Sequence, residues 1–276
     1  MPQPTLSIYT QTPYVRFLRD DIEPGTRLSA LREGTDHLPS PGGVTRMMRT
    51  LLAHVERSRR MAGATWVSLS SSAPTRVRLS DRVVLDTVRL EPHEQAEYAR
   101  AKGALWDAVH GLSPAPIAAG ELDALEHLSV AMAQRATATT PDLHYVHDFQ
   151  LLPLARHLPD RSPRVFHWHI PVANLAGEAR RYVAEHLNDY DAVIVSTRGY
   201  AKALRAAGVR VPAHARYPYI DETRHVVTRD ELAAFEARWR LDPQDVVFAV
   251  VARLDPMKSH DVAIRALARL PATAKL

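Results

Sequence analysis

Residues 143–154 read LHYVHDFQLLPL, and residues 164–171 read RVFHWHIP. In each stretch a short run of β-branched, aromatic and aliphatic residues is followed at once by polar side chains. Such runs predict buried strands at 143–146 and 165–169. Ligands of open α/β sheets bind beyond the carboxyl ends of the strands, so the polar residues that end these runs are the first candidates for a site.

The same alternation of short apolar runs and amphipathic stretches continues along most of the chain. Strands are also predicted at 6–9, 65–69, 82–85, 192–196, 213–217 and 246–251, and helices at 43–60, 92–110, 121–135, 149–158, 178–188, 197–207, 229–240 and 260–270. Thr228 followed by Glu231 forms a capping box and predicts a helix start at 229. The alternation indicates an α/β fold, a Rossmann-like parallel sheet with helices on both faces.

Composition excludes several classes of protein. The chain has 276 residues, 46% of them hydrophobic, and no cysteine, which excludes disulfides, thiolate nucleophiles and cysteine-based zinc sites. Its longest apolar runs, such as VVFAVVA at 246–252, are far shorter than the ~20 residues of a membrane span. We therefore expect a soluble, cytoplasmic protein without membrane contact.

Charge suggests an anionic ligand rather than a nucleic acid. The formal net charge is +4, and the basic residues are scattered among acidic ones. The arginines of the first predicted helix, among them Arg46, Arg49 and Arg57, have no interleaved aromatic residues. They are interpreted as a solvated helix face and not as a nucleic-acid surface.

A change in the sequence pattern after residue 227, from a polar helix to a very apolar strand, predicts a domain boundary. Residues 1–227 form an N-terminal Rossmann-like domain, 228–243 a linker helix, and 244–276 the start of a C-terminal α/β domain. One strand and one helix cannot cover their own apolar faces, so most of that domain is expected to be missing from the chain. The exposed strand then predicts homo-oligomerisation or a complementing C-terminal half as a partner.

Two loops have the chemistry of phosphate binding. Arg253 and Lys258 lie five residues apart on a strand-to-helix loop, which suits a diphosphate; the alternative is a solvated surface turn. Gly42 and Gly43 open a helix, where their backbone amides could approach a phosphate or a sugar; the alternative is an ordinary turn.

Histidines at 144, 147, 157, 167 and 169 suggest a metal site, but no carboxylate completes an expected ligand set. We therefore predict no metal and no cofactor. His169 is interpreted either as a ligand-binding residue or as a core histidine. Trp66, Trp168 and Trp239 are interpreted as core residues.

Taken together and in order, the motifs resemble the trehalose-6-phosphate synthase family, glycosyltransferase family 20. The matching segments are Pro41-Gly42-Gly43, Gly63-Ala64-Thr65-Trp66, Glu97-Tyr98 with Leu105-Trp106, Val146-His147-Asp148, His169-Ile170-Pro171, Asp189-Tyr190-Asp191, Tyr217-Pro218 with Ile220-Asp221, and Arg253-Leu254-Asp255 with Lys258. The resemblance implies the GT-B fold of two facing Rossmann-like domains. Residues 1–227 would then be the acceptor-side domain, and 244–276 the start of the domain that binds the nucleotide sugar. The resemblance also implies transfer, with retention, of a hexosyl group, here a glucosyl group, from UDP- or GDP-glucose to a sugar phosphate or polyol.

The resemblance also implies roles for individual residues. The catalytic residues would be His169, Asp148, Arg253 and Lys258. The nucleotide-sugar donor would be bound by the backbone of Gly42 and Gly43 and by the side chains of Ile170, Arg253 and Lys258. The acceptor would be bound by Asp148, Tyr98 and Trp106.

The departures from the family concentrate on the acceptor side. Where the family has an arginine after the first strand, this chain has Thr10-Gln11-Thr12-Pro13, with Arg16 as the nearest substitute, and Val172-Ala173-Asn174 replaces an aromatic residue and a proline. Two other functions fit these departures: a non-catalytic sugar-phosphate-binding or regulatory relative, and a cyclitol-coupling pseudo-glycosyltransferase.

Overall fold

The computed structural model describes residues 3–72, 75–112, 117–118, 120–136, 140–172, 175–219 and 226–275. The chain divides into two compact units, Met1–Ile220 and Asp221–Leu276. The motif residues Ile220 and Asp221, and the substituted residues Ala173 and Asn174, lie outside the described part of the chain. The finer division into 1–227, 228–243 and 244–276 stays a prediction.

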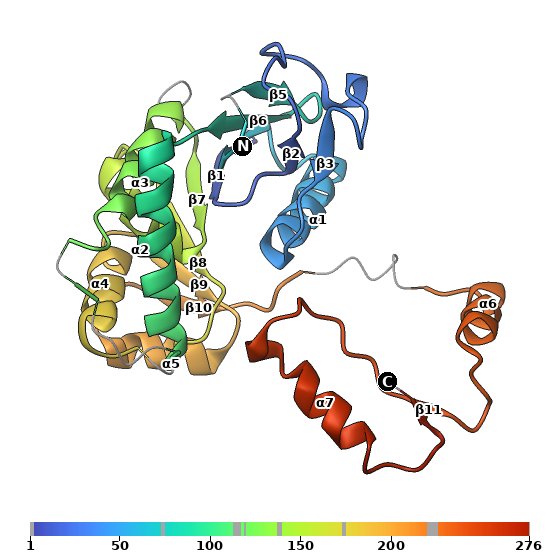
Figure 1. Cartoon of the computed structure of the whole chain (residues 1–276). Helices are drawn as coiled ribbons and strands as arrows, with labels where there is room; N and C mark the ends of the chain where they lie inside the picture. The colour runs from blue at the N-terminus through green and yellow to red at the C-terminus, as the bar shows by residue number, and fades with distance from the viewer. Residues whose placement is uncertain are drawn as a thin grey trace. The chain divides into compact units, whose positions relative to one another are not determined.

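The first unit is built on an eight-stranded sheet in the order β10-β9-β8-β7-β1-β4-β6-β5 (Figure 1). Every neighbouring pair is parallel except β5 with β6. The strands are β1 (Thr5–Thr10), β4 (Gly63–Leu69), β5 (Arg76–Arg78), β6 (Val83–Val88), β7 (Leu143–His147), β8 (Arg164–Trp168), β9 (Ala192–Val195) and β10 (Ala213–Ala215). Because these strands are parallel, the carboxyl ends of β1, β4, β7 and β8 meet at one edge of the sheet.

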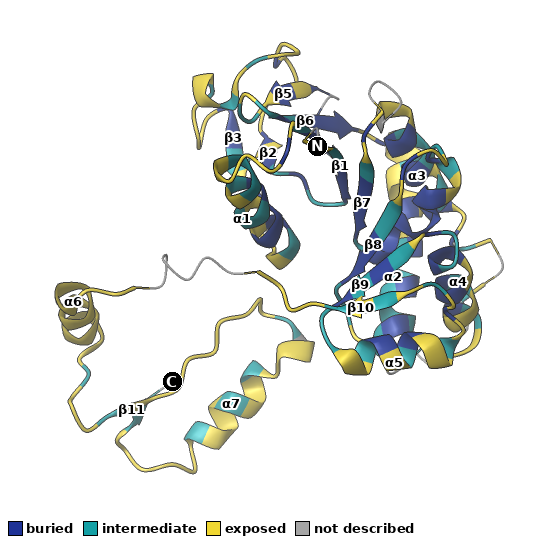
Figure 2. Ribbon diagram, turned by 180° about the vertical axis from the view of Figure 1, so that it is seen from behind, coloured by how far each residue is buried: buried dark blue, intermediate teal, exposed yellow. Residues whose placement is uncertain are grey.

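Helices cover both faces of this sheet, which confirms the predicted fold class (Figure 2). One face packs against α1 (Gly43–Arg57), so that Ile8 of β1 shares a core with Met48. The other face packs against α2 (Pro92–His110), α3 (Ala124–Ala136), α4 (Gly177–Leu187) and α5 (Arg198–Ala207), and Tyr9 shares that core with Leu105 of α2. Neighbouring residues of β1 thus enter opposite cores, as the alternation of a strand requires.

Five local features differ from the sequence prediction. Residues 149–158 were expected to form a regular helix, but they form the 3-10 helix η2 (Phe149–His157), because Leu151 leaves the helical region and Pro153 lacks an N–H donor. The three-residue strands β2 (Val15–Phe17), β3 (His37–Pro39) and β5 were not predicted, since three residues are too few to show a period of two. A short 3-10 helix, η1 (Leu28–Ala30), lies between β2 and β3.

The second unit contains α6 (Arg229–Trp239), β11 (Val246–Val247), the 3-10 turn η4 (Pro256–Lys258), α7 (His260–Leu267) and β12 (Ala274–Lys275). The predicted capping box is present: the Thr228 hydroxyl accepts a hydrogen bond from the Glu231 N–H at 3.2 Å. The strand predicted at 246–251 pairs only over Val246–Val247, because its described neighbour β12 is itself two residues long.

Apolar side chains of the second unit remain open to solvent, with Val251 96% and Leu254 93% exposed. None of the described helices has the length and apolarity that a membrane crossing would need.

We expect a chain cut after Val227 to stay folded and to be a more soluble monomer than the 276-residue chain. All residues of the two cores belong to the first unit, and exposed apolar surface of the second unit favours self-association. Analytical ultracentrifugation of both chains at matched concentrations measures this. A shortened chain that unfolds, or a long chain that stays monomeric at high concentration, would contradict the expectation.

Candidate functional site

Three loops that follow parallel strands meet at the edge of the sheet where the carboxyl ends of the strands lie. β1 is followed by Gln11, β7 by Asp148, and β8 by His169. The strands are paired in register, so that His147 at the end of β7 lies opposite His167 on β8. The register of the strands therefore brings together residues that are far apart in the sequence. The sequence predicts such proximity for polar residues that follow the strands.

Asp148 has a backbone conformation that residues other than glycine rarely adopt, with φ 70° and ψ 130°. Its carboxylate accepts a hydrogen bond from the backbone N–H of Gln11 at 3.0 Å, across the carboxyl ends of β1 and β7. Burial raises the pKa of Asp148 to about 6, and the Gln11 hydrogen bond and the charge of Lys102 oppose this rise. A strained conformation costs about 1–3 kcal/mol and concentrates at functional sites, which makes Asp148 a candidate functional carboxylate.

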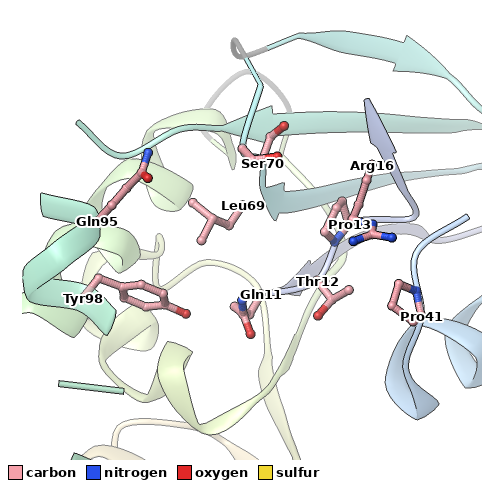
Figure 3. Close-up of a pocket in the computed structure, with 10 residues that line it drawn as sticks. Gln11, Thr12, Pro13, Arg16, Pro41, Leu69, Ser70, Gln95 and Tyr98 are labelled. Atoms are coloured by element: carbon pink, nitrogen blue, oxygen red, sulfur yellow. The ribbon is translucent and has the colours of Figure 1, made fainter. Parts of the chain in front are cut away.

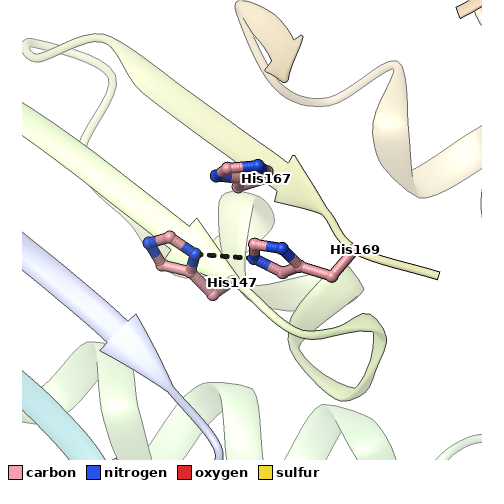
Figure 4. Close-up of side chains that lie close together, drawn as sticks. All are labelled: His147, His167 and His169. Atoms are coloured by element: carbon pink, nitrogen blue, oxygen red, sulfur yellow. Dashed lines mark hydrogen bonds between the residues drawn. The ribbon is translucent and has the colours of Figure 1, made fainter. Parts of the chain in front are cut away.

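His147, His167 and His169 form a compact cluster, and His147 directly precedes Asp148 in the chain (Figure 4). His147 and His167 are almost completely buried, whereas His169 keeps partial access to solvent. His147 Nδ1 lies 3.0 Å from His169 Nε2, and the rings of His167 and His169 stack with their centroids 4.0 Å apart. His167 Nδ1 is hydrogen-bonded to the hydroxyl of Tyr145 at 2.7 Å.

Burial keeps the imidazoles of His147, His167 and His169 neutral near pH 7. It lowers the pKa of His167 to about 4 and that of His169 to about 3, and it lowers the pKa of His147 well below its usual value. Neighbouring histidines add to the effect at His147 and His169. A neutral imidazole can donate or accept a hydrogen bond, but it cannot serve as a proton donor of the imidazolium type.

A cavity of about 430 Å³ opens beside the end of β1 (Figure 3). Its lining combines polar groups with one cation: Gln11, Thr12, Pro13, Arg16, Pro41, Leu69, Ser70, Ser71, Gln95 and Tyr98. Arg16 is exposed and forms no ion pair with any carboxylate in the described ranges. An unpaired guanidinium among hydroxyl and amide groups suits a polar anion such as a sugar phosphate.

Tyr98 and Trp106, both expected at the acceptor, lie in different surroundings. Tyr98 lines the cavity, and its buried hydroxyl has no hydrogen-bond partner among the described residues. Burial, and secondly the charge of Asp148, raise the pKa of Tyr98 well above its usual value. Trp106 is absent from the described cavity lining and packs against His110 and Phe149, with ring centroids 3.9 and 5.8 Å away.

The residues expected at the donor are divided between the two units. Gly42, with φ 127°, is the N-cap residue before α1, and a Cβ on Gly42 or Gly43 would meet no atom within 4 Å. Ile170 packs partly against the larger core. Arg253 and Lys258 are exposed on the turn between β11 and α7 in the second unit, and Arg253 lies 3.8 Å from Asp255.

Several cavity residues were missed by the sequence analysis. Ser70 and Gln95 belong to no motif and carried no detectable signal, and Gln11 had been noted only as part of a departure from the family pattern. The partner of Asp148 could have been anticipated only from the pairing of β1 with β7. His147 belonged to the Val146-His147-Asp148 motif but had been assigned no role.

The first unit has a Rossmann-like α/β fold, and part of it matches a known family model. Residues 75–202 match the family model described as trehalose synthase, N-terminal domain. No curated protein sequence gives a significant match. The matched segment contains Tyr98, Asp148 and His169, whereas Arg253 and Lys258 lie outside it.

Solved structures extend the likeness beyond that segment. A trehalose-6-phosphate synthase, OtsA, matches with a TM-score of 0.67 at 18% identity, over 96% of this chain and 61% of its own. The E. coli enzyme bound with UDP-2-fluoro glucose matches with a TM-score of 0.60 at 17% identity, over 88% and 55%. Anabaena HepE in complex with UDP and glucose matches with a TM-score of 0.57 at 16% identity, over 98% and 59%.

These matches confirm the resemblance to trehalose-phosphate synthases that the sequence motifs indicated. At these identities the solved structures establish the fold. The chain spans little more than half the length of the structures it matches.

We expect the free energy of unfolding to fall as the pH is lowered from 7 to 5. His144, His147, His167 and His169 all have lowered pKa values when folded, so below the ordinary histidine pKa the unfolded chain binds more protons. Each can contribute up to about 1.4 kcal/mol per pH unit. The raised pKa values of Asp148 and Asp86 act in the opposite direction, but a fifth histidine, His186, also has a lowered pKa, so that five groups oppose two.

Urea denaturation at pH 7, 6 and 5 measures this dependence. His144→Gln, which removes one of these histidines outside the cluster, should make the fall shallower. A midpoint that stays constant or rises on acidification would show that the histidines are not neutral in the folded protein.

Proposed function

We propose that the chain provides the acceptor side of a retaining glycosyltransferase. It would take part in moving a glucosyl group from UDP- or GDP-glucose to a sugar phosphate or a related polyol. The observation that carries the proposal is Asp148, a strained carboxylate held by the Gln11 N–H near a cavity that contains the unpaired Arg16. The matches to trehalose-6-phosphate synthases support the same function.

Asp148 and Arg16 would hold the acceptor. The carboxylate of Asp148 accepts a hydrogen bond from an acceptor hydroxyl, and Arg16 binds the acceptor phosphate in the cavity. The hydroxyl oxygen bonds to the anomeric carbon on the face from which the diphosphate leaves, so the configuration is retained. The hydroxyl proton passes to the leaving phosphate oxygen, and no further co-reactant is needed.

Each unit would have its own groups for binding a nucleotide sugar. The backbone of Gly42 and Gly43 approaches the nucleotide sugar, and His169, as a neutral imidazole, hydrogen-bonds the sugar beside Ile170. Arg253 and Lys258 would stabilise the negative charge that grows on the diphosphate as it leaves, which is the largest contribution expected from the protein. Resident metals and cofactors take no part in this proposal.

Calorimetry with UDP-glucose, GDP-glucose and glucose 6-phosphate, followed by product analysis, tests the proposal. We expect weak binding of a nucleotide sugar and of the sugar phosphate, and no turnover by the 276-residue chain alone. Sugar-phosphate binding without any nucleotide-sugar binding would favour the non-catalytic relative. Absence of binding to either ligand class would refute the proposal.

On the acceptor side, we expect Arg16→Ala to weaken glucose 6-phosphate binding about 10- to 100-fold, since a charge-assisted contact contributes about 1.5–3 kcal/mol. Asp148→Asn should weaken acceptor binding while donor binding stays almost unchanged, because the amide keeps the shape but loses the strong acceptor. Arg57→Ala, an exposed arginine at the end of α1, serves as the control. A donor affinity that collapses in Asp148→Asn would assign this residue to the other half of the site.

On the donor side, Arg253→Ala and Lys258→Ala should each reduce nucleotide-sugar affinity, and should reduce the transfer rate at least ~10²-fold in any chain that turns over. Arg269→Ala changes an exposed arginine of the same unit and is the matched control. Near-normal affinity and rate in both variants would exclude the diphosphate site.

A further inference from the structure

The three-histidine cluster does not have the geometry of a metal site. One nitrogen of each ring lies within 4.8 Å of the others, which brings the ligand atoms close enough to consider an ion. The rings of His167 and His169, however, are stacked with their planes 30° apart, so their in-plane lone pairs do not converge. His147 and His169 moreover direct Nδ1 and Nε2 at each other at 3.0 Å, the distance of a hydrogen bond.

The proton in that hydrogen bond can be assigned from burial. His147 Nε2 is buried and has no hydrogen-bond partner among the described residues. If Nε2 carried the proton of neutral His147, an N–H donor would be buried without an acceptor, and orphaned donors are rarer than unsatisfied acceptors. The proton therefore resides on Nδ1, where it is donated to His169 Nε2.

His167 repeats the same arrangement on the neighbouring strand. Its Nε2 is also buried and without a partner in the described chain, and its Nδ1 faces the Tyr145 hydroxyl at 2.7 Å. By the same reasoning His167 donates from Nδ1 to Tyr145. The two buried rings next to His169 thus have fixed tautomers.

We propose that His147 is a positioning residue that fixes the tautomer of His169. Because His169 Nε2 accepts the hydrogen bond from His147, the proton of neutral His169 is on Nδ1. His169 then presents a single N–H donor to a ligand and no basic nitrogen. It can donate to a hydroxyl or ring oxygen of a bound hexose, and it cannot remove a proton from the acceptor.

This assignment rests on the proposed function only for the identity of the ligand, since the tautomer is a property of the chain itself. Histidine ¹⁵N NMR of the chain at pH 7 reads the protonation of each nitrogen directly. We expect His169 to be protonated on Nδ1, although a free neutral histidine favours the opposite tautomer. Protonation of His169 on Nε2 in the unaltered chain would overturn the proposal.

Two substitutions separate positioning from packing. His147→Asn keeps an N–H donor at a position similar to Nδ1, whereas His147→Leu removes the donor and keeps an apolar side chain. We expect the Nδ1–H tautomer of His169 to persist in His147→Asn and to be lost in His147→Leu, with the fold checked by circular dichroism. His144→Gln, a buried histidine bonded to Tyr9 elsewhere on β7, should leave the His169 signals unchanged.

Nucleotide-sugar binding by the same variants distinguishes the two proposals. A roughly tenfold loss of UDP-glucose affinity in His147→Leu, restored in His147→Asn, would support the positioning role at the donor. If the tautomer behaves as expected but no variant and no unaltered chain binds a nucleotide sugar, the proposed function fails and the assignment of His147 stands. If His147→Leu leaves the tautomer of His169 unchanged, the assignment of His147 is wrong.

Discussion

The in-register pairing of the parallel strands β1, β7 and β8 is the constraint on which the site depends. It aligns Tyr9 with Val146 and His147 with His167, so that the loops after the three strands leave the sheet at the same level. If β7 slipped by one residue against its neighbours, His147 and His167 would lie on opposite faces of the sheet, and Asp148 would move away from Gln11. The backbone hydrogen bonds between these strands therefore determine where the site lies, and the side chains determine what it can bind.

Desolvation then determines the chemistry that this frame can support. The same burial that keeps the imidazoles of the cluster uncharged raises the pKa of Asp148, so the site contains few formal charges of its own. Arg16 is the charged group that the described cavity offers to a ligand. Such a site suits a ligand with many hydroxyl groups and one anionic group, since hydroxyls can pair with neutral donors and acceptors.

Much of the fold followed from the sequence, because the signals that define long elements are local. The helix predicted at 92–110 has those bounds in the structure, with a capping box at Glu91 and Gly111 in the left-handed conformation at its end. The contact between Gln11 and Asp148 joins residues 137 positions apart and depends on strand order, which no local pattern contains. The cluster of His147, His167 and His169 depends on register in the same way, and for that reason the sequence indicated the histidines but not their hydrogen bonds.

The conformation of Asp148 also has a consequence for how this position can change. A glycine at 148 would relieve backbone strain of about 1–3 kcal/mol, but it would lose roughly 0.5–1 kcal/mol through the flexibility of the unfolded chain. It would also remove the carboxylate that accepts the hydrogen bond of the Gln11 N–H, and a hydrogen bond to a charged group contributes about 1.5–3 kcal/mol. The carboxylate thus stabilises the strained backbone that positions it, and replacing it with glycine would exchange one energetic cost for another of similar size.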